Sequence, residues 1–375
     1  MIARLSDAFG DFAGRSWLNT AHQGALPLPA AEAAHEAIRW KTAPHELTTE
    51  RFEEVPRRLR TALGRLVGAP PGQIVLANSA SYGLHLIANA YPWAPGDEVL
   101  VMAGDFPSDI FPWLTLERRG VTTRRVRPAD RMVTADELAA AVTPRTRLFC
   151  VTWVHSFSGK VADLDALGAV CRERGVHFVV NGSQAVGARP LDVSRAPVDA
   201  LVSVGFKWLC GPYGTGFAWL SPALRAVLVP PKAYWLAYLS QRDLARDDLE
   251  PELTPGDRHD LDIFGTANFH NYVPWTRSVE HVLDLGVDRI RAHDAALVER
   301  LTEGLRAKGM RVSPTDSTLL YFSHPDPGRN KALHERLAAE GIDVALRAGS
   351  LRASPHLYNS TVDVDRLLDA VSRAD

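Results

Sequence analysis

Short, continuously apolar runs alternate with longer amphipathic stretches over residues 73–221. The runs are QIVLAN (73–78), EVLVMAG (98–104), RLFCVTWV (147–154), HFVVNG (177–182), ALVSVGF (200–206) and TGFAWLS (215–221). Continuously apolar strands separated by helix-length segments are typical of a mostly parallel sheet with helices on both faces. The pattern therefore predicts an α/β fold. Ligands of such sheets bind outside the carboxyl ends of the strands, so we look for chemistry directly after each run.

The pattern changes near residue 276. A long amphipathic stretch at 278–309 is followed by short apolar runs and further helical patterns, which is typical of a second, α+β unit. A chain of 375 residues is also longer than one small core requires. We therefore expect a large domain over 45–275 and a small domain formed by 1–44 together with 276–375.

Two further segments carry expectations about packing. The stretch 27–44 begins with a helical pattern, which we expect to pack on the small domain. The Pro- and Asp-rich stretch 229–260 is long for a connection without secondary structure. It predicts an extended excursion over the surface or onto a partner subunit, with local disorder as the alternative.

Composition narrows the classes of partner. The chain is 46% hydrophobic and 23% charged with a formal net charge of -2, so electrostatics favour neither nucleic acid nor a membrane surface. Its three cysteines lack the spacing of a zinc site or a disulfide framework, which favours the reducing cytoplasm and predicts no metal. No export signal or membrane span is evident in the sequence. We expect a small-molecule substrate and a second copy of the chain as partners.

One lysine directly follows an apolar strand pattern. In SVGFKWLCGPYGTGFAWL (203–220), Lys207 precedes a glycine-rich turn. Burial lowers the pKa of an amine, and an amine of low pKa can form a Schiff base with a carbonyl group. A solvated lysine beside a turn would have the same local sequence, so Lys207 alone does not decide the function.

The strand end before Lys207 carries a family resemblance. HFVVNGSQAVGARP (177–190) ends an apolar strand with Asn-Gly-Ser-Gln, and Lys207 follows some two dozen residues later. With its other motifs in matching order, the chain resembles the class V aminotransferase group of pyridoxal-phosphate enzymes, within fold type I. Members of that group have Asp-Gly-X-Gln here and then the Schiff-base lysine. The resemblance implies a pyridoxal 5'-phosphate cofactor linked to Lys207.

The resemblance also implies how the phosphate is held. In ANSASYGLHL (77–86), backbone N–H groups at Ala80 and Ser81 and the helix dipole would form an anion site, although an ordinary helix cap would look the same. Ser203 would be a second contact. FGTANF (264–269) resembles a Gly-Thr-X-Asn segment that crosses from the neighbouring subunit. Thr266 is therefore expected to reach the active site of a partner in a homodimer.

The cofactor ring has its own expected contacts. GDFPSDIFPW (104–113) resembles the kynureninase-like form of the segment that covers the ring, in which Phe106 would stack on the ring and Asp109 would lie near the cofactor. Gln184 would hydrogen-bond the phenolic oxygen, and Ser183 would add a cofactor contact. Asn181 takes the position beside the pyridine nitrogen.

The substrate carboxylate is expected at the C-terminal end of the chain. RAGSLRASPHLYNSTVDVDRL (347–367) resembles the family's carboxylate region, and Arg352 is the first candidate because a guanidinium binds a carboxylate in a bidentate manner. Arg347 is the second. His22 in LNTAHQGALP (18–27) and His155 are further candidates for substrate contacts, with a structural role as the alternative for His155.

The chain departs from the family in two places. The desulfurase subgroup has a nucleophilic cysteine between its two C-terminal arginine motifs, whereas here the interval 348–351 is Ala-Gly-Ser-Leu. A persulfide-forming desulfurase is therefore not expected. Asn181 is neutral where the family has an aspartate, so we expect a mostly unprotonated ring nitrogen and a higher barrier for reactions that need a long-lived carbanion. An engineered change or a paralogue of weakened activity would also explain Asn181.

These arguments lead to one main hypothesis with alternatives. The chain is expected to be a C–S β-lyase of secondary metabolism that acts on a cysteine S-conjugate, with Lys207 as the general base and Arg352 as the carboxylate clamp. Decarboxylation with oxidative deamination, epimerisation and transamination use the same two residues. A non-catalytic protein that keeps the fold to bind the cofactor is the alternative from another class.

Overall fold

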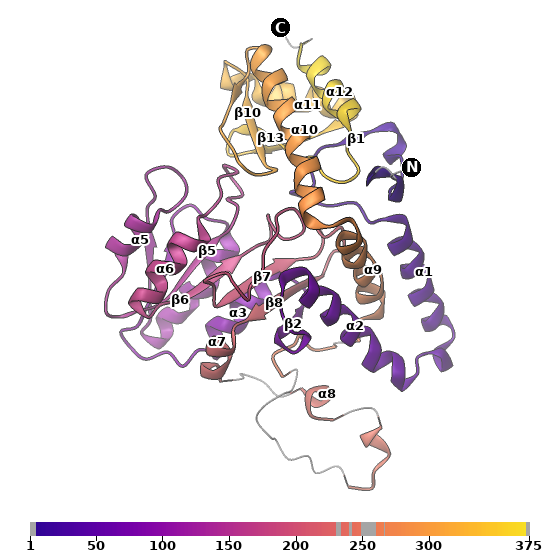
Figure 1. Ribbon diagram of the computed structural model, residues 1–375, viewed down its shortest axis with the longest axis vertical. Coiled ribbons are helices and arrows are strands. Elements are labelled where there is room, and N and C mark those ends of the chain that lie inside the picture. The colour runs from indigo at the N-terminus through magenta and orange to yellow at the C-terminus, as the bar shows by residue number, and fades with distance from the viewer. Residues whose placement is uncertain (1–4, 230–233, 240–241, 249–259, 266, 373–375) are drawn as a thin grey trace.

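The computed structural model describes residues 5–229, 234–239, 242–248, 260–265 and 267–372, and its central element is a mostly parallel sheet (Figure 1). Within these residues the sheet has seven strands, in the spatial order β2 (Ile74–Ala77), β8 (Gly216–Leu220), β7 (Ala200–Val204), β6 (His177–Asn181), β5 (Thr146–Thr152), β3 (Glu98–Met102) and β4 (Thr122–Val126). Neighbouring strands are parallel except at β8, which is antiparallel to both β2 and β7. The predicted α/β fold is confirmed.

Helices cover both faces of this sheet, as continuously apolar strands require. One face packs on α2 (Thr49–Val67), α5 (Ala135–Ala141) and α6 (Leu164–Arg174). The other face packs on α3 (Ala80–Ala90), α4 (Phe111–Leu114) and α7 (Pro222–Val227). Successive strand residues alternate between the two cores: Phe149 and Val151 point to the first, and Leu148 and Cys150 to the second. Because β3, β5, β6 and β7 run parallel, the residues at their carboxyl ends lie at the same end of the sheet.

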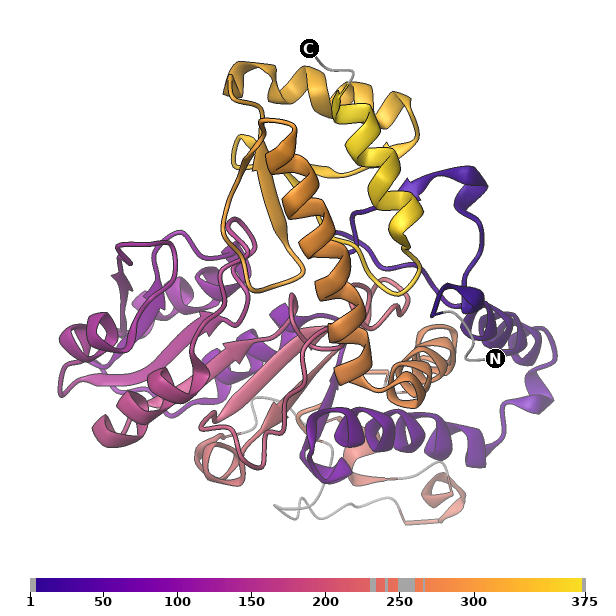
Figure 2. The same cartoon turned by 45° about the horizontal axis from the view of Figure 1, so that its top comes forward.

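A smaller antiparallel sheet lies near the C-terminus. Its strands, within the described part of the chain, are ordered β12 (Ala345–Arg347), β13 (Ser350–Ala353), β10 (Leu320–Ser323) and β9 (Arg311–Val312). A separate core forms between this sheet and α10 (Val287–Ala307), α11 (Asn330–Ala339) and α12 (Thr361–Ser372). Figures 1 and 2 both show α10 running from the large sheet to the small one, so this helix connects the two.

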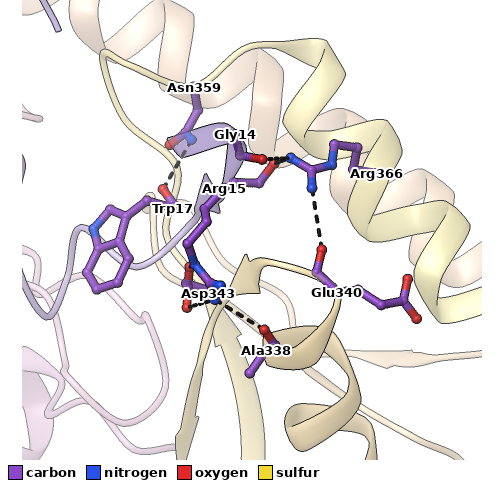
Figure 3. A network of polar contacts seen from close by, with 9 residues as sticks. Gly14, Arg15, Trp17, Ala338, Glu340, Asp343, Asn359 and Arg366 are labelled. Carbon is purple, nitrogen blue, oxygen red and sulfur yellow. Dashed lines mark hydrogen bonds and ion pairs between the residues drawn. The ribbon is translucent and has the colours of Figure 1, made fainter. Parts of the chain in front are cut away.

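The N-terminal residues are tied to this smaller region. Strand β1 (Ser16–Trp17) pairs in parallel with β11 (Ile342–Asp343). Figure 3 shows the polar contacts beside this pairing: Arg15 donates to the Asp343 carboxylate at 2.9 Å, and Arg366 donates to the Gly14 carbonyl at 2.8 Å. These contacts fix the direction in which the following segment, residues 18–27, leaves the small sheet.

The helix predicted from 27–44 is α1 (Leu28–Thr42), and it packs along α9 (Phe269–Leu285), as Figures 1 and 2 show. Helix α9 crosses residue 276, where the predicted domains meet, so α1 contacts residues on both sides of that boundary. The division into 45–275 and 1–44 plus 276–375 stays a prediction. Within 229–260 the described residues include the short helix α8 (Trp235–Tyr238). No helix in the described ranges is long and apolar enough to span a bilayer.

A buried ion pair joins the edge of the large sheet to α2. Arg60 of α2 pairs with Asp262, and both side chains are almost fully buried. The second Asp262 oxygen accepts the backbone N–H of Leu76 at 2.7 Å. Losing one partner of such a pair leaves an uncompensated charge in the core.

We predict that Asp262→Ala lowers the free energy of unfolding by about 3–5 kcal/mol, since Arg60 would stay buried without its counter-charge. Chemical denaturation followed by circular dichroism measures the change. Asp365→Ala is the control, because Asp365 pairs with Arg300 in solvent, and it should cost less than about 1 kcal/mol. Equal effects of the two variants would contradict the prediction.

Candidate active site

Lys207 lies just after the carboxyl end of β7, in a turn at the start of the segment 205–215 that leads to β8. Its Nζ atom lies 5.8 Å from the centre of the Phe106 ring. Burial, helped by the positive charge of Arg352, lowers the pKa of the amine to about 8, while the Asp109 carboxyl acts in the opposite direction. The expectation of an amine with a depressed pKa thus agrees with its surroundings.

The N-terminal segment packs directly against this turn. Gly24 donates its N–H to the Phe206 carbonyl at 2.9 Å, and a Cβ atom at Gly24 would lie 1.9 Å from the Lys207 carbonyl oxygen. Only a glycine permits this approach. His22 lies close by: burial and the nearby cations, Arg347, Arg352 and Lys207, lower its pKa. The predicted lip at 18–27 therefore does border the lysine.

The Lys207 turn is also held from its other side. Trp208 donates its indole N–H to the Gln184 side-chain oxygen at 3.1 Å, and Gln184 donates to the Ala21 carbonyl at 3.1 Å. The Trp208 carbonyl faces Nε2 of His356 at 3.1 Å, and Nδ1 of His356 faces Asp294 at 2.9 Å. Both of those partners are acceptors, so both ring nitrogens carry a proton. Although burial acts against it, the Asp294 carboxylate raises the pKa of His356 to about 10.

This support was missed in the sequence. His356 stands between the arginine and Tyr-Asn parts of the C-terminal motif, but nothing in its local sequence indicates a partner at Asp294, in the middle of a helix. The hydrogen bond spans 62 residues of sequence. The one available signal was Asp294 itself, a carboxylate on the apolar face of the amphipathic stretch 278–309, where a charged side chain needs a partner.

Asn181 faces a carboxyl group. Its Nδ2 atom donates to Oδ1 of Asp109 at 2.6 Å, and its Oδ1 atom accepts the Ser183 N–H at 3.0 Å. The side-chain hydroxyl of Ser183 is buried and has no hydrogen-bond partner among the described residues. The sequence placed Asp109 near the cofactor but did not connect it with Asn181. Asp109 lies fully buried beside this residue, which the family resemblance places at the ring nitrogen.

Arg352 lies on β13 and is only 3% exposed. Its Nη1 atom donates to the Ser156 carbonyl at 3.4 Å, and the Tyr321 hydroxyl donates to the same carbonyl. The Nε atom has no partner within the described ranges. A buried guanidinium that keeps a donor unused suits an anionic ligand. Arg347, by contrast, is exposed on β12.

His155 has both ring nitrogens occupied. Nδ1 lies 2.7 Å from the Ser158 hydroxyl and Nε2 lies 3.1 Å from the Gly104 carbonyl. Burial is the main cause that lowers its pKa, so the ring is neutral near pH 7. This geometry favours the structural interpretation of His155, and a substrate contact stays a prediction.

Two of the predicted phosphate residues lie at the start of α3. Ser79 caps this helix by accepting the N–H of Tyr82 at 3.2 Å, which leaves Ala80 and Ser81 in its first turn. Ser203 is buried on β7, where its hydroxyl donates to the Val204 carbonyl at 3.2 Å. Thr266 lies outside the described residues.

The interval that carries a cysteine in desulfurases is a tight hairpin here. Arg347 pairs with Ser350 across β12 and β13, so only Ala348 and Gly349 form the turn, with φ angles of 49° and 78°. Two consecutive positive φ angles are typical of a two-residue hairpin turn. All three cysteines of the chain are buried elsewhere.

Comparison with known proteins agrees with this architecture. The profile of the family described as Aminotransferase class-V matches residues 31–367. Isopenicillin N epimerase of Streptomyces clavuligerus is 30% identical, over 94% of this chain and 93% of that protein. A probable cysteine desulfurase of Xylella fastidiosa (strain 9a5c) is 28% identical, over 88% of this chain and 82% of that protein. The solved complex of the cystine C–S lyase C-DES with its reaction product cysteine persulfide shares the fold, with a TM-score of 0.88 and 22% identity over 96% of this chain and 98% of that chain.

Fold and family together define a pyridoxal-phosphate-dependent enzyme of fold type I. The chain belongs to the class V aminotransferase family. Its cofactor is pyridoxal phosphate, as in the rest of that family. The side chains around Lys207 fit this cofactor, because they combine one amine of low pKa with three buried polar atoms that lack partners among the described residues: Ser183 Oγ, Asp109 Oδ2 and Arg352 Nε.

We predict that the rate of covalent cofactor uptake by the apoprotein rises about tenfold per pH unit below pH 8 and levels off above it, because only the neutral Lys207 amine attacks an aldehyde. Borohydride trapping followed by mass spectrometry measures this rate. Arg352→Gln removes a charge that lowers the pKa of Lys207, so the inflection should move to higher pH. Lys160→Gln should leave the profile unchanged. An inflection at the ordinary lysine pKa in the wild-type protein would disprove the prediction.

Proposed function

We propose that the protein is a C–S lyase that cleaves a cysteine S-conjugate by β-elimination. The observation that carries the proposal is the pairing of Lys207, an amine whose pKa is about 8, with Arg352, a buried guanidinium that retains an unused N–H donor among the described residues. The first supplies a base near neutral pH and the second a binding point for a carboxylate. An amino acid offers both an α-proton and a carboxylate.

The residues that would hold the cofactor follow from the resemblance. Lys207 would bind it covalently, Phe106 would lie on its ring, and Asn181, Ser183 and Gln184 would contact the ring substituents. Ala80, Ser81 and Ser203, with Thr266 of a partner subunit, would hold the phosphate. When bound, the cofactor withdraws electrons from the α-carbon of the substrate and so makes its proton acidic.

The protein's own groups would then direct the reaction. Arg352 would fix the substrate carboxylate through two parallel N–H donors, which orients the α-carbon toward Lys207. At pH 7–8 a substantial fraction of an amine with a pKa of about 8 is neutral, so Nζ of Lys207 can accept the α-proton. The Lys207 turn is held by Trp208 and by the Gly24 contact, which limits how far Nζ can move.

The missing thiol determines how a C–S bond could break. A desulfurase needs a cysteine that attacks the sulfur of its substrate, and the hairpin at Ala348 and Gly349 offers none. Without that nucleophile, sulfur leaves from Cβ with the electrons of the C–S bond. The substrate and one water then yield a thiol, pyruvate and ammonia.

Epimerisation at the α-carbon is the second candidate. The isopenicillin N epimerase of Streptomyces clavuligerus is 30% identical over nearly the whole chain. Inversion requires a proton donor on the face opposite Lys207, and His22 is the titratable residue of the lip at 18–27. Burial and the nearby cations lower the pKa of His22. Pyruvate is not a product of epimerisation, so the two candidates differ in an easily measured outcome.

A homodimer is part of the proposal. Its support is the Gly-Thr-X-Asn resemblance at 264–269, through which Thr266 would serve the neighbouring site. Mixed dimers of the inactive variants Lys207→Ala and Thr266→Ala would each contain one intact site. Activity regained on mixing would support the shared site, and no recovery despite confirmed mixed dimers would refute it. Cytoplasmic location and a role in secondary metabolism stay predictions.

We predict that purified protein with added pyridoxal phosphate shows the absorbance band of a lysine-bound cofactor, and that Lys207→Ala abolishes this band. With S-substituted cysteines, the wild-type enzyme should release pyruvate and thiol in equal amounts, measured by a coupled dehydrogenase assay and a thiol reagent. Arg352→Lys should raise KM for substrate roughly tenfold or more, because bidentate binding is lost.

Other products would exclude the lyase reaction and indicate a different reaction of the same cofactor. A cofactor-bound protein that exchanges the α-proton for deuterium and inverts the amino acid without pyruvate would replace the lyase with the epimerase. A new keto acid formed with an aminated acceptor would indicate transamination. Release of carbon dioxide and an aldehyde would indicate decarboxylation. A protein that takes up no cofactor would exclude the whole proposal.

A further inference from the structure

Two buried carboxyl groups lie together beside Asn181. Asp105 is 4% exposed and Asp109 is completely buried. Asp105 accepts the backbone N–H groups of Phe106 at 2.7 Å and of Thr152 at 3.0 Å. Asp109 accepts the Asn181 amide through Oδ1, whereas its Oδ2 atom finds no N–H or O–H donor in the described part of the chain. A buried carboxyl oxygen without a hydrogen-bond donor is unusual and requires an explanation.

A proton on one of the two carboxyl groups explains it, because the protonated oxygen needs no N–H or O–H donor. Two carboxylates that are buried close together repel each other, which favours a proton on one of them. Burial, together with the charge of Asp105, raises the pKa of Asp109 well above its usual value, and burial also raises the pKa of Asp105. Because two backbone N–H groups stabilise the Asp105 carboxylate, the proton belongs on Asp109.

The other groups that face this pair are few. Lys207 acts on Asp109 through its positive charge, and Asn181 acts on it through the hydrogen bond. The thiol of Cys150, on β5, is also close to the pair. Burial and the two carboxyl groups raise its pKa, so the thiol stays protonated. Trp113 donates its indole N–H to the Asp109 backbone carbonyl at 2.9 Å, which fixes the short helical turn that carries this residue.

We propose that Asp109 is the acid that protonates the ring nitrogen of the cofactor, and that Asn181 positions it. The inference rests on the proposed function, because the family resemblance places residue 181 at that nitrogen. In this chain the side chain at 181 is an amide, and the carboxyl group stands one hydrogen bond away, at 2.6 Å. The carboxyl group that the family has at the end of β6 is thus replaced, in this chain, by one in the segment after β3.

Protons and charges balance in this step. The O–H bond of Asp109 breaks, its electron pair stays on the carboxylate, and an N–H bond forms at the ring nitrogen. The total charge of the two carboxyl groups and the ring is unchanged, while the positive ring offsets the repulsion between two buried carboxylates. A neutral amide at 181 then no longer disfavours reactions that need a stabilised carbanion, and epimerisation remains chemically open beside elimination.

The test compares two cofactors that differ at one atom. Apoprotein is titrated with pyridoxal phosphate and with its 1-deaza analogue, in which a C–H group replaces the ring nitrogen. The aldehyde, phosphate and phenol are the same, so the ratio of the two dissociation constants isolates the ring nitrogen. We expect the wild-type protein to prefer pyridoxal phosphate by about tenfold or more, as a charge-assisted hydrogen bond would provide.

Asp-to-Asn exchanges, which barely change side-chain shape, test whether Asp109 causes the preference for pyridoxal phosphate over its 1-deaza analogue. Asp109→Asn should abolish it, because the amide has no acidic proton. The double variant Asp109→Asn with Asn181→Asp exchanges the partners of one hydrogen bond and should restore the preference, since the carboxyl then stands at 181. Asp97→Asn is the control: this buried acid pairs with Arg147 at the other end of β3 and should leave the ratio unchanged.

A second readout is independent of affinity. With cofactor labelled with ¹⁵N in the ring, the nitrogen chemical shift should indicate a protonated ring in the wild-type and exchanged proteins and an unprotonated ring in Asp109→Asn. An Asp109→Asn protein with the wild-type ratio and shift would overturn the proposal while leaving the proposed function intact. Equal affinity of the wild-type protein for both compounds would do the same. A protein that binds neither compound would refute the proposed function itself.

Discussion

The active-site geometry depends on one buried ion pair. His356 and Asp294 belong to the C-terminal half of the chain, yet His356 donates its second N–H to the carbonyl of Trp208, the residue after Lys207. Both partners are completely buried. Such a pair adds little net stability compared with apolar side chains, because desolvation offsets most of the attraction. Its effect is instead to orient the backbone: Asp294 on α10 holds the charged His356 ring, which donates to the backbone carbonyl next to Lys207.

The charges around Lys207 also constrain one another. Two charged groups act on the Lys207 amine in opposite directions: the Arg352 guanidinium lowers its pKa and the Asp109 carboxyl group raises it. Burial lowers the pKa values of Lys207 and Arg352, and a carboxylate at Asp109 opposes this effect for the lysine. The pKa of Lys207 therefore depends on the charge state of Asp109.

Sequence patterns were sufficient for the features that depend on neighbouring residues. Continuous apolar runs predicted the buried strands, and the position of Lys207 after one of them predicted an amine at the carboxyl end of the sheet. The position of Asn181 at a strand end was predicted, but its hydrogen bond to Asp109, 72 residues away in the sequence, was not. His356 and Asp294 were missed for the same reason. A polar residue that positions another residue leaves no local sequence pattern. Its hydrogen-bond partner comes from a distant part of the chain and is determined by how the helices and strands pack.

The hairpin between β12 and β13 connects the missing thiol to the position of Arg352. Because Arg347 and Ser350 pair directly, the register continues without interruption to Arg352, which lies opposite Ala345 on one side and Tyr321 on the other. A long loop at this point would allow β13 to shift relative to β12, and a shift by one residue would turn Arg352 to the other face of the sheet. The short turn, which contains no cysteine, thus also fixes the position of Arg352. One structural feature therefore underlies both parts of the proposed function, namely elimination without a protein thiol and binding of the substrate carboxylate by Arg352.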